Sequence, residues 1–198
     1  MEAAEEIFKE EPKDEISPLI EKAMEHMGKL DMDSARELLE QALEKDPCHA
    51  NALRQLFSIE RHQPARAQFH RAAESLLAHL CAARATYGQA CDSYADYCAA
   101  AKPQRLSLGL YVRLGMAHAD TGRLEQAEKI FVTLLRQKPD TQGLPAALLK
   151  LEDAFRKKNL PAKSAACLQA ICSSYPESPA ARIAATALAA ARSDTLTS

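Results

Sequence analysis

Histidine and cysteine are the side chains with which this sequence could perform catalysis, and neither is arranged for it. The six histidines are scattered, and Glu25-His26 has no second histidine at helical spacing to complete a metalloprotease site. The six glycines never cluster into a loop that could cradle phosphate, and no nucleophile-elbow or P-loop signature occurs. We therefore predict a protein that is not an enzyme and uses no cofactor.

The six cysteines do not form a metal-binding pattern, because none lies in a Cys-x-x-Cys pair. Cys91 and Cys98 are seven residues apart and share a helical face with Tyr87 and Tyr94. We interpret this stripe as the buried seam of a helix over 85–101, and expect no metal. A small helical enzyme or ligand-binding protein that uses this Tyr/Cys face or a histidine stays as an alternative.

Composition and charge argue against several classes of protein. The chain has 198 residues, a formal net charge of −2 and a pI near 6.3, which argues against a nucleic-acid partner. No apolar run approaches about 18 residues, and the acidic N-terminus lacks an apolar signal core, so neither membrane insertion nor a secretory signal is expected. Reduced thiols and a cytoplasmic location are predicted, with disulfides left open for a chain exported by another route.

The elements that carry these residues are predicted to be helices. Alanine is abundant and glycine scarce, and apolar residues recur at helical spacing between short breaks. Such short connections force neighbouring helices to pack as antiparallel hairpins. The second helix is expected to start at Asp33-Ser34 and to stop at Asp46-Pro47. The other predicted helices lie at about 18–29, 50–61, 64–82 (opening at Pro64), 85–101, 105–119, 124–137, 143–157, 162–174 and 178–192.

Small, aromatic and proline residues fall at fixed offsets across 111–139. They match the spacing W-x2-L-G-x2-Y, then A-x3-F, then P, with Tyr111 in place of the tryptophan and His118 in place of the tyrosine. The stretch resembles a tetratricopeptide repeat, which implies an all-α fold of helix hairpins stacked into a right-handed superhelix. Gly115 and Ala127 are small enough for close helix approach. The matching residues are Tyr111, Leu114, Gly115, His118, Gly122, Ala127, Phe131 and Pro139.

Weaker copies of this repeat lie on both sides. Upstream, Ala35, Leu39, Ala42 and Pro47 keep the offsets; downstream, Glu152 stands where the small residue should be. The 92 residues from Pro47 to Pro139 are not a multiple of the 34-residue unit, so a degenerate pair and an inserted helix at 85–101 are expected between them. We predict an acidic flexible leader at 1–15, one domain over 16–192 and a flexible tail at 193–198, with repeats at about 16–49, 50–82, 108–141 and 145–178 and a capping helix at 178–192.

The resemblance implies a concave surface lined by the first helix of each hairpin. Repeats that clamp acidic chaperone tails carry Lys and Asn where this sequence has apolar residues, so such clamping is not expected. An apolar, methionine-lined groove that binds a peptide or an amphipathic helix is predicted instead. The alternative is that these residues are core. The groove candidates are Ile20, Met24, Met27, Val112, Met116, Ala119, Leu149, Asp153 and Arg156.

A second resemblance concerns context. The order of the acidic leader, "LDMDSARELLEQALEKDP", the inserted helix, "LRQKPDTQGLPAALLKLEDAFRKKN" and "LQAICSSYPES" is similar to cytosolic helical tails of some bacterial rhomboid-type intramembrane proteases. This resemblance implies a recruiting module of a larger membrane protein. The main prediction is a protein-interaction scaffold with a protein or peptide partner, and a homo-oligomer is left open.

Overall fold

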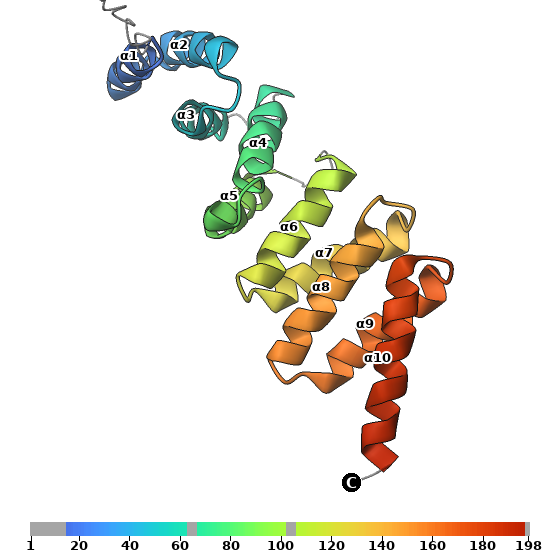
Figure 1. The fold of residues 1–198 in the computed structure, drawn as a ribbon. Helices are drawn as coiled ribbons and strands as arrows, with labels where there is room; N and C mark the ends of the chain where they lie inside the picture. The colour runs from blue at the N-terminus through green and yellow to red at the C-terminus, as the bar shows by residue number, and fades with distance from the viewer. Residues whose placement is uncertain (1–14, 63–66, 102–105, 197–198) are drawn as a thin grey trace, which may run out of the picture. The chain divides into compact units, whose positions relative to one another are not determined.

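The computed structural model describes residues 15–62, 67–101 and 106–196, and side chains only as far as residue 191. All regular structure in these residues is helical, and within each of the two units described below consecutive helices pack against each other (Figure 1). The contacts divide the chain into two compact units, Met1–His62 and Gln63–Ser198, each of which is described by itself. The predicted all-α fold of helix hairpins is confirmed.

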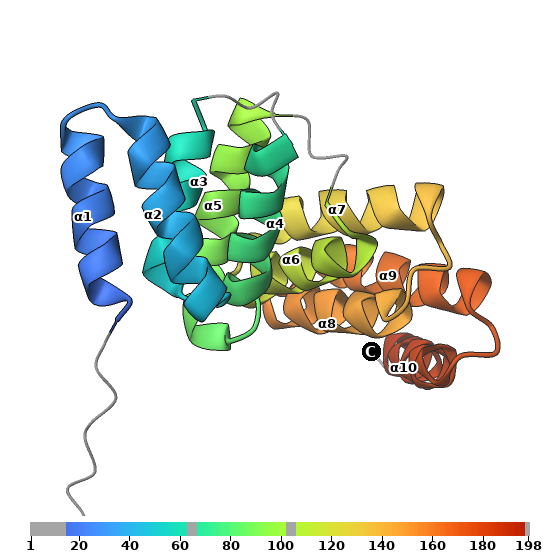
Figure 2. The same ribbon diagram turned by 90° about the horizontal axis from the view of Figure 1, so that it is seen from above.

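Unit 1 consists of α1 (Ser17–Gly28), α2 (Met32–Lys45) and α3 (Ala50–Glu60). Pro18 lies in the first turn of α1. Backbone N–H groups there have no acceptor within the helix, so a proline at this position costs no hydrogen bond. Ala23 of α1 and Ala35 of α2 are fully buried in one core cluster, so the two helices meet through small side chains. In Figure 2 they lie side by side.

Helix α2 begins earlier than predicted. Asp31, rather than Asp33 or Ser34, is the N-cap residue, and its carboxylate accepts a hydrogen bond from the Ser34 amide at 3.2 Å. The same carboxylate contacts His26 Nδ1 at 2.9 Å. Hydrogen bonds from Ser34 and then from His26 lower the pKa of Asp31. The cap and the α1–α2 turn are therefore joined through one side chain.

A buried ion pair joins α2 to α3. Arg36 Nε donates to Glu60 Oε1 at 2.5 Å, and Glu60 is fully buried. Arg36 also contacts the exposed Asp33 through Nη1 at 2.6 Å. The hydrogen bond to Glu60, the largest of these effects, raises the pKa of Arg36, a side chain that is charged at neutral pH in any environment.

Unit 2 contains the remaining helices, and most of their limits agree closely with the prediction. The fourth predicted helix opens at Pro64 and the sixth at residue 105, and both starts lie outside the described residues. The sixth helix begins at Leu108, and the last one continues beyond residue 192. Helix α10 packs on α9 and α8 and is seen end-on in Figure 2. The elements are α4 (Ala67–Leu80), the 3₁₀ helix η1 (Arg84–Thr86), α5 (Tyr87–Ala100), α6 (Leu108–Asp120), α7 (Leu124–Gln137), α8 (Leu144–Lys157), α9 (Pro161–Ser174) and α10 (Pro179–Leu196).

Helix α5 was expected to be an insertion, but it packs against α4 and α6. Tyr97 is fully buried on the α4 side, where its ring stacks on Phe69 at 5.5 Å and its hydroxyl lies 2.9 Å from His70 Nδ1. Tyr94 meets Tyr111 of α6 edge to face at 6.3 Å. The pairing of α4 with α5 escapes sequence analysis because this pair replaces the repeat signature with aromatic contacts.

The α6–α7 hairpin shows the packing that the repeat signature predicts. A Cβ atom added to Gly115 would lie 2.5 Å from ring carbons of Phe131, so the glycine lets α7 approach α6. Phe131 and Ala127 are both fully buried. This close approach confirms a tetratricopeptide-like hairpin from its own geometry.

The α8–α9 hairpin solves the same packing problem with polar groups. Glu152 and Ser164 occupy the positions of Gly115 and Ala127, and both are buried. Ser164 Oγ donates to Glu152 Oε1 at 2.7 Å. Leu168 stands where α7 has Phe131, so this position holds a smaller side chain in the second hairpin. Glu152 is held by the Ser164 hydrogen bond and by an ion pair with Arg156, whose Nε lies 3.6 Å from Oε1.

The turns of the α1–α2, α6–α7 and α8–α9 hairpins each have one residue with a backbone conformation in the left-handed region. Leu30, Gly122 and Asn159 have φ of 62°, 77° and 55° at equivalent positions. Glycine adopts this conformation freely and asparagine tolerates it, but leucine does so at a cost. Leu30 is also 81% exposed, so packing does not offset that cost.

Candidate functional site

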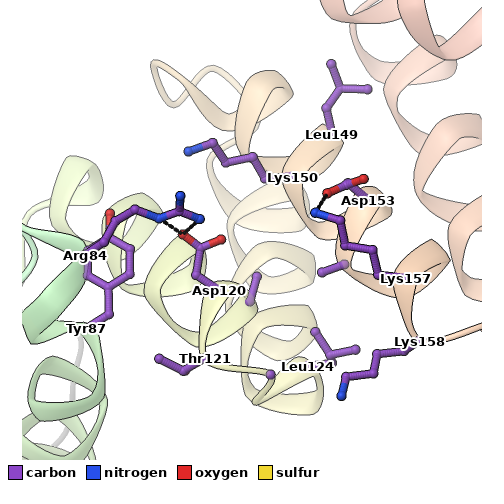
Figure 3. Close-up of a pocket in the computed structure, with 13 residues that line it drawn as sticks. Arg84, Tyr87, Asp120, Thr121, Leu124, Leu149, Lys150, Asp153, Lys157 and Lys158 are labelled. Carbon is purple, nitrogen blue, oxygen red and sulfur yellow. Dashed lines mark hydrogen bonds and ion pairs between the residues drawn. The ribbon is translucent and has the colours of Figure 1, made fainter.

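A hollow of about 710 Å³ in unit 2 is the candidate site (Figure 3). One wall is the C-terminal end of α6 with the turn into α7, next to the start of α5, and the opposite wall is the outer face of α8. Its size falls in the range of ligand sites in proteins. The first wall consists of Arg84, Tyr87, Ala119, Asp120, Thr121, Gly122 and Leu124. The second consists of Leu149, Lys150, Asp153, Ala154, Lys157 and Lys158.

Both carboxylates of the hollow are already engaged. Asp120 accepts from Arg84 Nε at 3.1 Å and lies 3.0 Å from its Nη2. Asp153 contacts Lys157 Nζ at 2.5 Å and also pairs with Arg156. These ion pairs hold the charged side chains against their own walls, so they leave the space between the walls open (Figure 3).

Two lysines of the α8 wall keep unpaired charge. Lys150 and Lys158 are exposed, and neither forms an ion pair with any residue that the structure describes. In Figure 3 they extend from the two ends of the α8 wall. The lining residues carry four cationic and two anionic side chains, so the hollow has a net positive charge.

Both walls of the hollow also present apolar side chains. Leu149 and Tyr87 are half-buried on opposite walls, and Leu124 lies at the start of α7. A hollow with apolar side chains on both walls and positive charge along one of them can hold a segment that offers an apolar side chain and carboxylates together. It offers no paired acid and base and no nucleophile next to a base.

The predicted groove residues of unit 1 differ in accessibility. Ile20 is 4% exposed and belongs to the core cluster, so it is not available at a surface. Met27 is half-buried and packs against that cluster, whereas Met24 is 50% exposed. Met24 is thus the candidate in this unit that presents most of its side chain.

The candidates of unit 2 divide in the same way. Val112 is 6% exposed and Ala119 is 5% exposed, so both belong to the packed interior, although Ala119 also borders the hollow. Met116 is half-buried. Leu149 and Asp153 lie together in the hollow, and Arg156 is exposed beside it. A groove lined by all the predicted residues stays a prediction, and Leu149 with Asp153 are the two that the structure brings together in the hollow.

The Tyr/Cys stripe on α5 is not the uniform seam that the spacing predicts. Cys91 is fully buried and Tyr94 is half-buried, but Cys98 is exposed. Tyr97 and Ala90 are buried in addition, because α5 contacts helices on two sides. Burial, the largest effect, raises the pKa of the Cys91 thiol and raises that of Cys81 to about 11. Such thiols are protonated at neutral pH and are poor nucleophiles.

His118 is the buried aromatic residue that the repeat alignment predicts. It is 3% exposed, and its ring meets Tyr94 edge to face at 5.9 Å. Neither ring nitrogen has a hydrogen-bond partner among the described residues. Burial, with a smaller effect of Arg123, lowers the pKa of His118 to about 4. The imidazole is therefore neutral and packed at physiological pH.

The sequence pattern does not point to Lys150, Lys158 or Arg84. The repeat signature marks positions that pack between helices, and these three lie on outer faces or outside the signature. The one available signal is Lys157-Lys158 at the C-terminal end of a helix that also carries Lys150. In the described ranges, no group of three or more His, Cys, Asp or Glu side chains could hold a metal, and no helix is long and apolar enough to cross a membrane.

The hairpins define the class, which is an all-α, tetratricopeptide-like helical-repeat fold. No family model and no curated protein matches the chain. Among solved structures, it is similar to YrrB, a TPR protein with an unusual peptide-binding site, at 17% identity and a TM-score of 0.45, over 88% of this chain and 94% of that one. It is also similar to TTC0263, a thermophilic TPR protein in Thermus thermophilus, at 15% identity and a TM-score of 0.40, over 87% and 98%.

A third similar structure is PilW, a widely conserved type IV pilus biogenesis factor, at 16% identity and a TM-score of 0.37, over 80% of this chain and 76% of that one. The likeness to these proteins is one of fold. At these identities and TM-scores it extends to no ligand or partner. None of the three concerns the rhomboid-type proteases, and that resemblance stays a prediction.

Proposed function

We propose that this protein is a non-catalytic interaction scaffold that binds a peptide or a helix of a protein partner. The observation that carries the proposal is the hollow between α6 and α8, which combines apolar side chains on both walls with uncompensated positive charge. It includes Leu149 and Asp153 from the predicted groove. The absence of a nucleophile–base pair at the hollow and the raised pKa of the buried thiols support a binding role over catalysis.

The chemistry of the hollow also defines the ligand in outline. Lys150 and Lys158 favour carboxylates, and Leu149 with Tyr87 favours an apolar anchor. Asp120 and Asp153 are held by their own cations, so they repel such a ligand less than free carboxylates would. A methionine-lined groove around Met24 or Met116 is the competing surface within the same function.

The test is selection of peptides from a displayed random library against the immobilised full chain. Enriched peptides are then labelled, and their affinities are measured by fluorescence anisotropy. We expect Lys150→Glu/Lys158→Glu to weaken binding about tenfold or more, since two attractive charges become repulsive. The matched control is Lys138→Glu, an exposed lysine of unit 2 outside the hollow, and it should leave affinity within about twofold.

Met24→Glu and Met116→Glu, each made singly, distinguish the competing surface. If they weaken binding while the lysine variant does not, the groove is the binding surface and the hollow is not. If selection enriches no peptide that binds the wild-type chain, the scaffold proposal fails. Circular dichroism of every variant establishes that a loss of affinity is not a loss of helix.

A further inference from the structure

The two units of this near-neutral chain have opposite charge. Residues 1–62 contain sixteen acidic and eight basic side chains, whereas residues 63–198 contain eleven acidic and seventeen basic ones. The net charge of −2 is therefore the sum of a negative net charge in residues 1–62 and a positive net charge in residues 63–198. Such separation favours association between unlike parts of two copies, because like parts repel.

Residues 1–14 have the chemistry that the hollow can recognise. Their sequence, MEAAEEIFKEEPKD, holds six acidic residues and two lysines around the apolar pair Ile7-Phe8. Glu5-Glu6 precede this pair, and Glu10-Glu11 follow it closely. The other segments outside the described residues, 63–66, 102–105 and 197–198, contain no acidic residue. Charge therefore singles out residues 1–14 among them.

The spacing of charges agrees as well. Lys150 and Lys158 are eight residues apart along α8, which corresponds to about 12 Å at 1.5 Å per helical residue. Glu6 and Glu10 are four residues apart, which corresponds to about 13 Å in an extended chain. In an extended segment Glu6, Phe8 and Glu10 share one face, so a carboxylate can lie near each lysine of α8 with Phe8 on the same side, while Ile7 points toward the opposite wall.

We propose that the hollow of unit 2 binds residues 1–14 of a second copy of this chain. The inference rests on the proposed function and names its partner. Phe8 contacts the α8 wall at Leu149 and Ile7 contacts the opposite wall at Tyr87, and the flanking glutamates pair with Lys150 and Lys158. Because the two surfaces differ, the contact is heterologous, and each copy can both give a segment and receive one.

The first test uses a labelled peptide of residues 1–14 and the full chain in fluorescence anisotropy at low and high salt. Binding should be saturable and weaken with salt. It should fall about tenfold or more with Lys150→Glu/Lys158→Glu, or with Ile7→Ser/Phe8→Ser in the peptide. Lys138→Glu is the control and should bind as the wild type does. A Glu6→Lys/Glu10→Lys peptide should bind the Lys150→Glu/Lys158→Glu chain better than it binds the wild type.

The second test is sedimentation velocity of the full chain over a range of concentrations. The wild type should increase in average mass with concentration, and Ile7→Ser/Phe8→Ser in the full chain should remain monomeric at equal helicity. A wild type that stays monomeric, or a peptide whose binding ignores either pair of substitutions, overturns the inference. If library-selected peptides bind the hollow while the 1–14 peptide does not, this inference fails and the proposed function stands; if neither binds, both fail.

Discussion

The α6–α7 and α8–α9 hairpins share a backbone plan but differ in how they fill it. In the first, the large Phe131 ring packs directly against Gly115, which has no side chain. In the second, Glu152 and Ser164 are joined by a buried hydrogen bond of 2.7 Å. The shared backbone arrangement therefore limits the combined volume of the facing side chains and requires hydrogen bonds for their buried polar atoms. It does not require a particular residue type at each position.

The outer faces of the two hairpins differ for another reason. The end of α6 presents small residues and Asp120 to the hollow, whereas α8 presents Leu149, Lys150 and Lys158. No packing rule requires these outer residues, since they do not lie between paired helices. Residue differences between the paired helices thus affect stability, whereas differences on the outer faces affect binding. The two effects can be tested with separate substitutions.

Apart from the reference truncation Phe155→Ala, the largest expected effect on stability comes from removing the small residue of the first hairpin. Gly115→Ala places a Cβ about 2.5 Å from the buried Phe131 ring and should lower the free energy of unfolding by about 2–3 kcal/mol. Phe131→Leu, the residue of the second hairpin, should partly relieve this clash, as urea unfolding of the double-mutant cycle would show. Strictly additive losses would contradict the compensation argument.

The next effect is a difference in pH dependence between the hairpins. Because the pKa of His118 is about 4 in the folded chain and near 6.5 when unfolded, the unfolded state binds more protons between these values. His118 should therefore contribute a loss of stability as pH falls from about 6.5 to 4, on the order of 2–3 kcal/mol in full.

His118→Phe tests this, because Phe155 stands at the equivalent position. The variant should be more stable than the wild type, and its advantage should grow as pH falls from about 7.5 to about 4.5 in urea unfolding. Phe155→Ala, measured as a reference for core loss, should cost about 3–5 kcal/mol without this dependence. An advantage for His118→Phe that does not change with pH would show that the histidine is not buried neutral.

The hydrogen bond of the second hairpin should have a smaller effect. Ser164→Ala restores the residue type of the first hairpin but leaves the buried Glu152 carboxylate without its hydroxyl donor. We expect a loss of about 1.5–3 kcal/mol, because the acceptor is charged and buried. Ser173→Ala on the exposed side of α9 is the control and should change stability by less than about 0.5 kcal/mol. Equal effects would mean that the Ser164–Glu152 bond is not formed.

The smallest expected effect concerns the hairpin turns and has the opposite sign. Leu30→Asn introduces the residue type of the third turn at a position with φ of 62° and should raise the free energy of unfolding by about 0.5–1 kcal/mol. Lys29→Asn, one residue earlier at φ −90°, is the control and should not stabilise. Thermal unfolding of both variants would show whether the backbone conformation, and not asparagine itself, is responsible.

Much of the fold can be predicted from the sequence. The length of the repeat and the close approach of its two helices are both indicated by Gly115, Ala127, Phe131 and Pro139. The pairing of α4 with α5 cannot be predicted in this way, because it depends on a contact between Tyr97 and Phe69. These two residues are distant in sequence and belong to no repeat signature. The hollow is harder still. Lys150 and Leu149 are adjacent on α8, and only the placement of α6 opposite them turns an exposed helix face into a site.

The most direct test of the binding account is a ¹H–¹⁵N NMR titration of the full chain with a peptide enriched from the displayed library. The account predicts that amide shifts concentrate at 119–124 and 149–158, the two walls of the hollow. The Lys150→Glu/Lys158→Glu chain should lose these shifts. Shifts concentrated around Met24 and Met27, with the hollow unchanged, would contradict the account and place binding at the methionine surface.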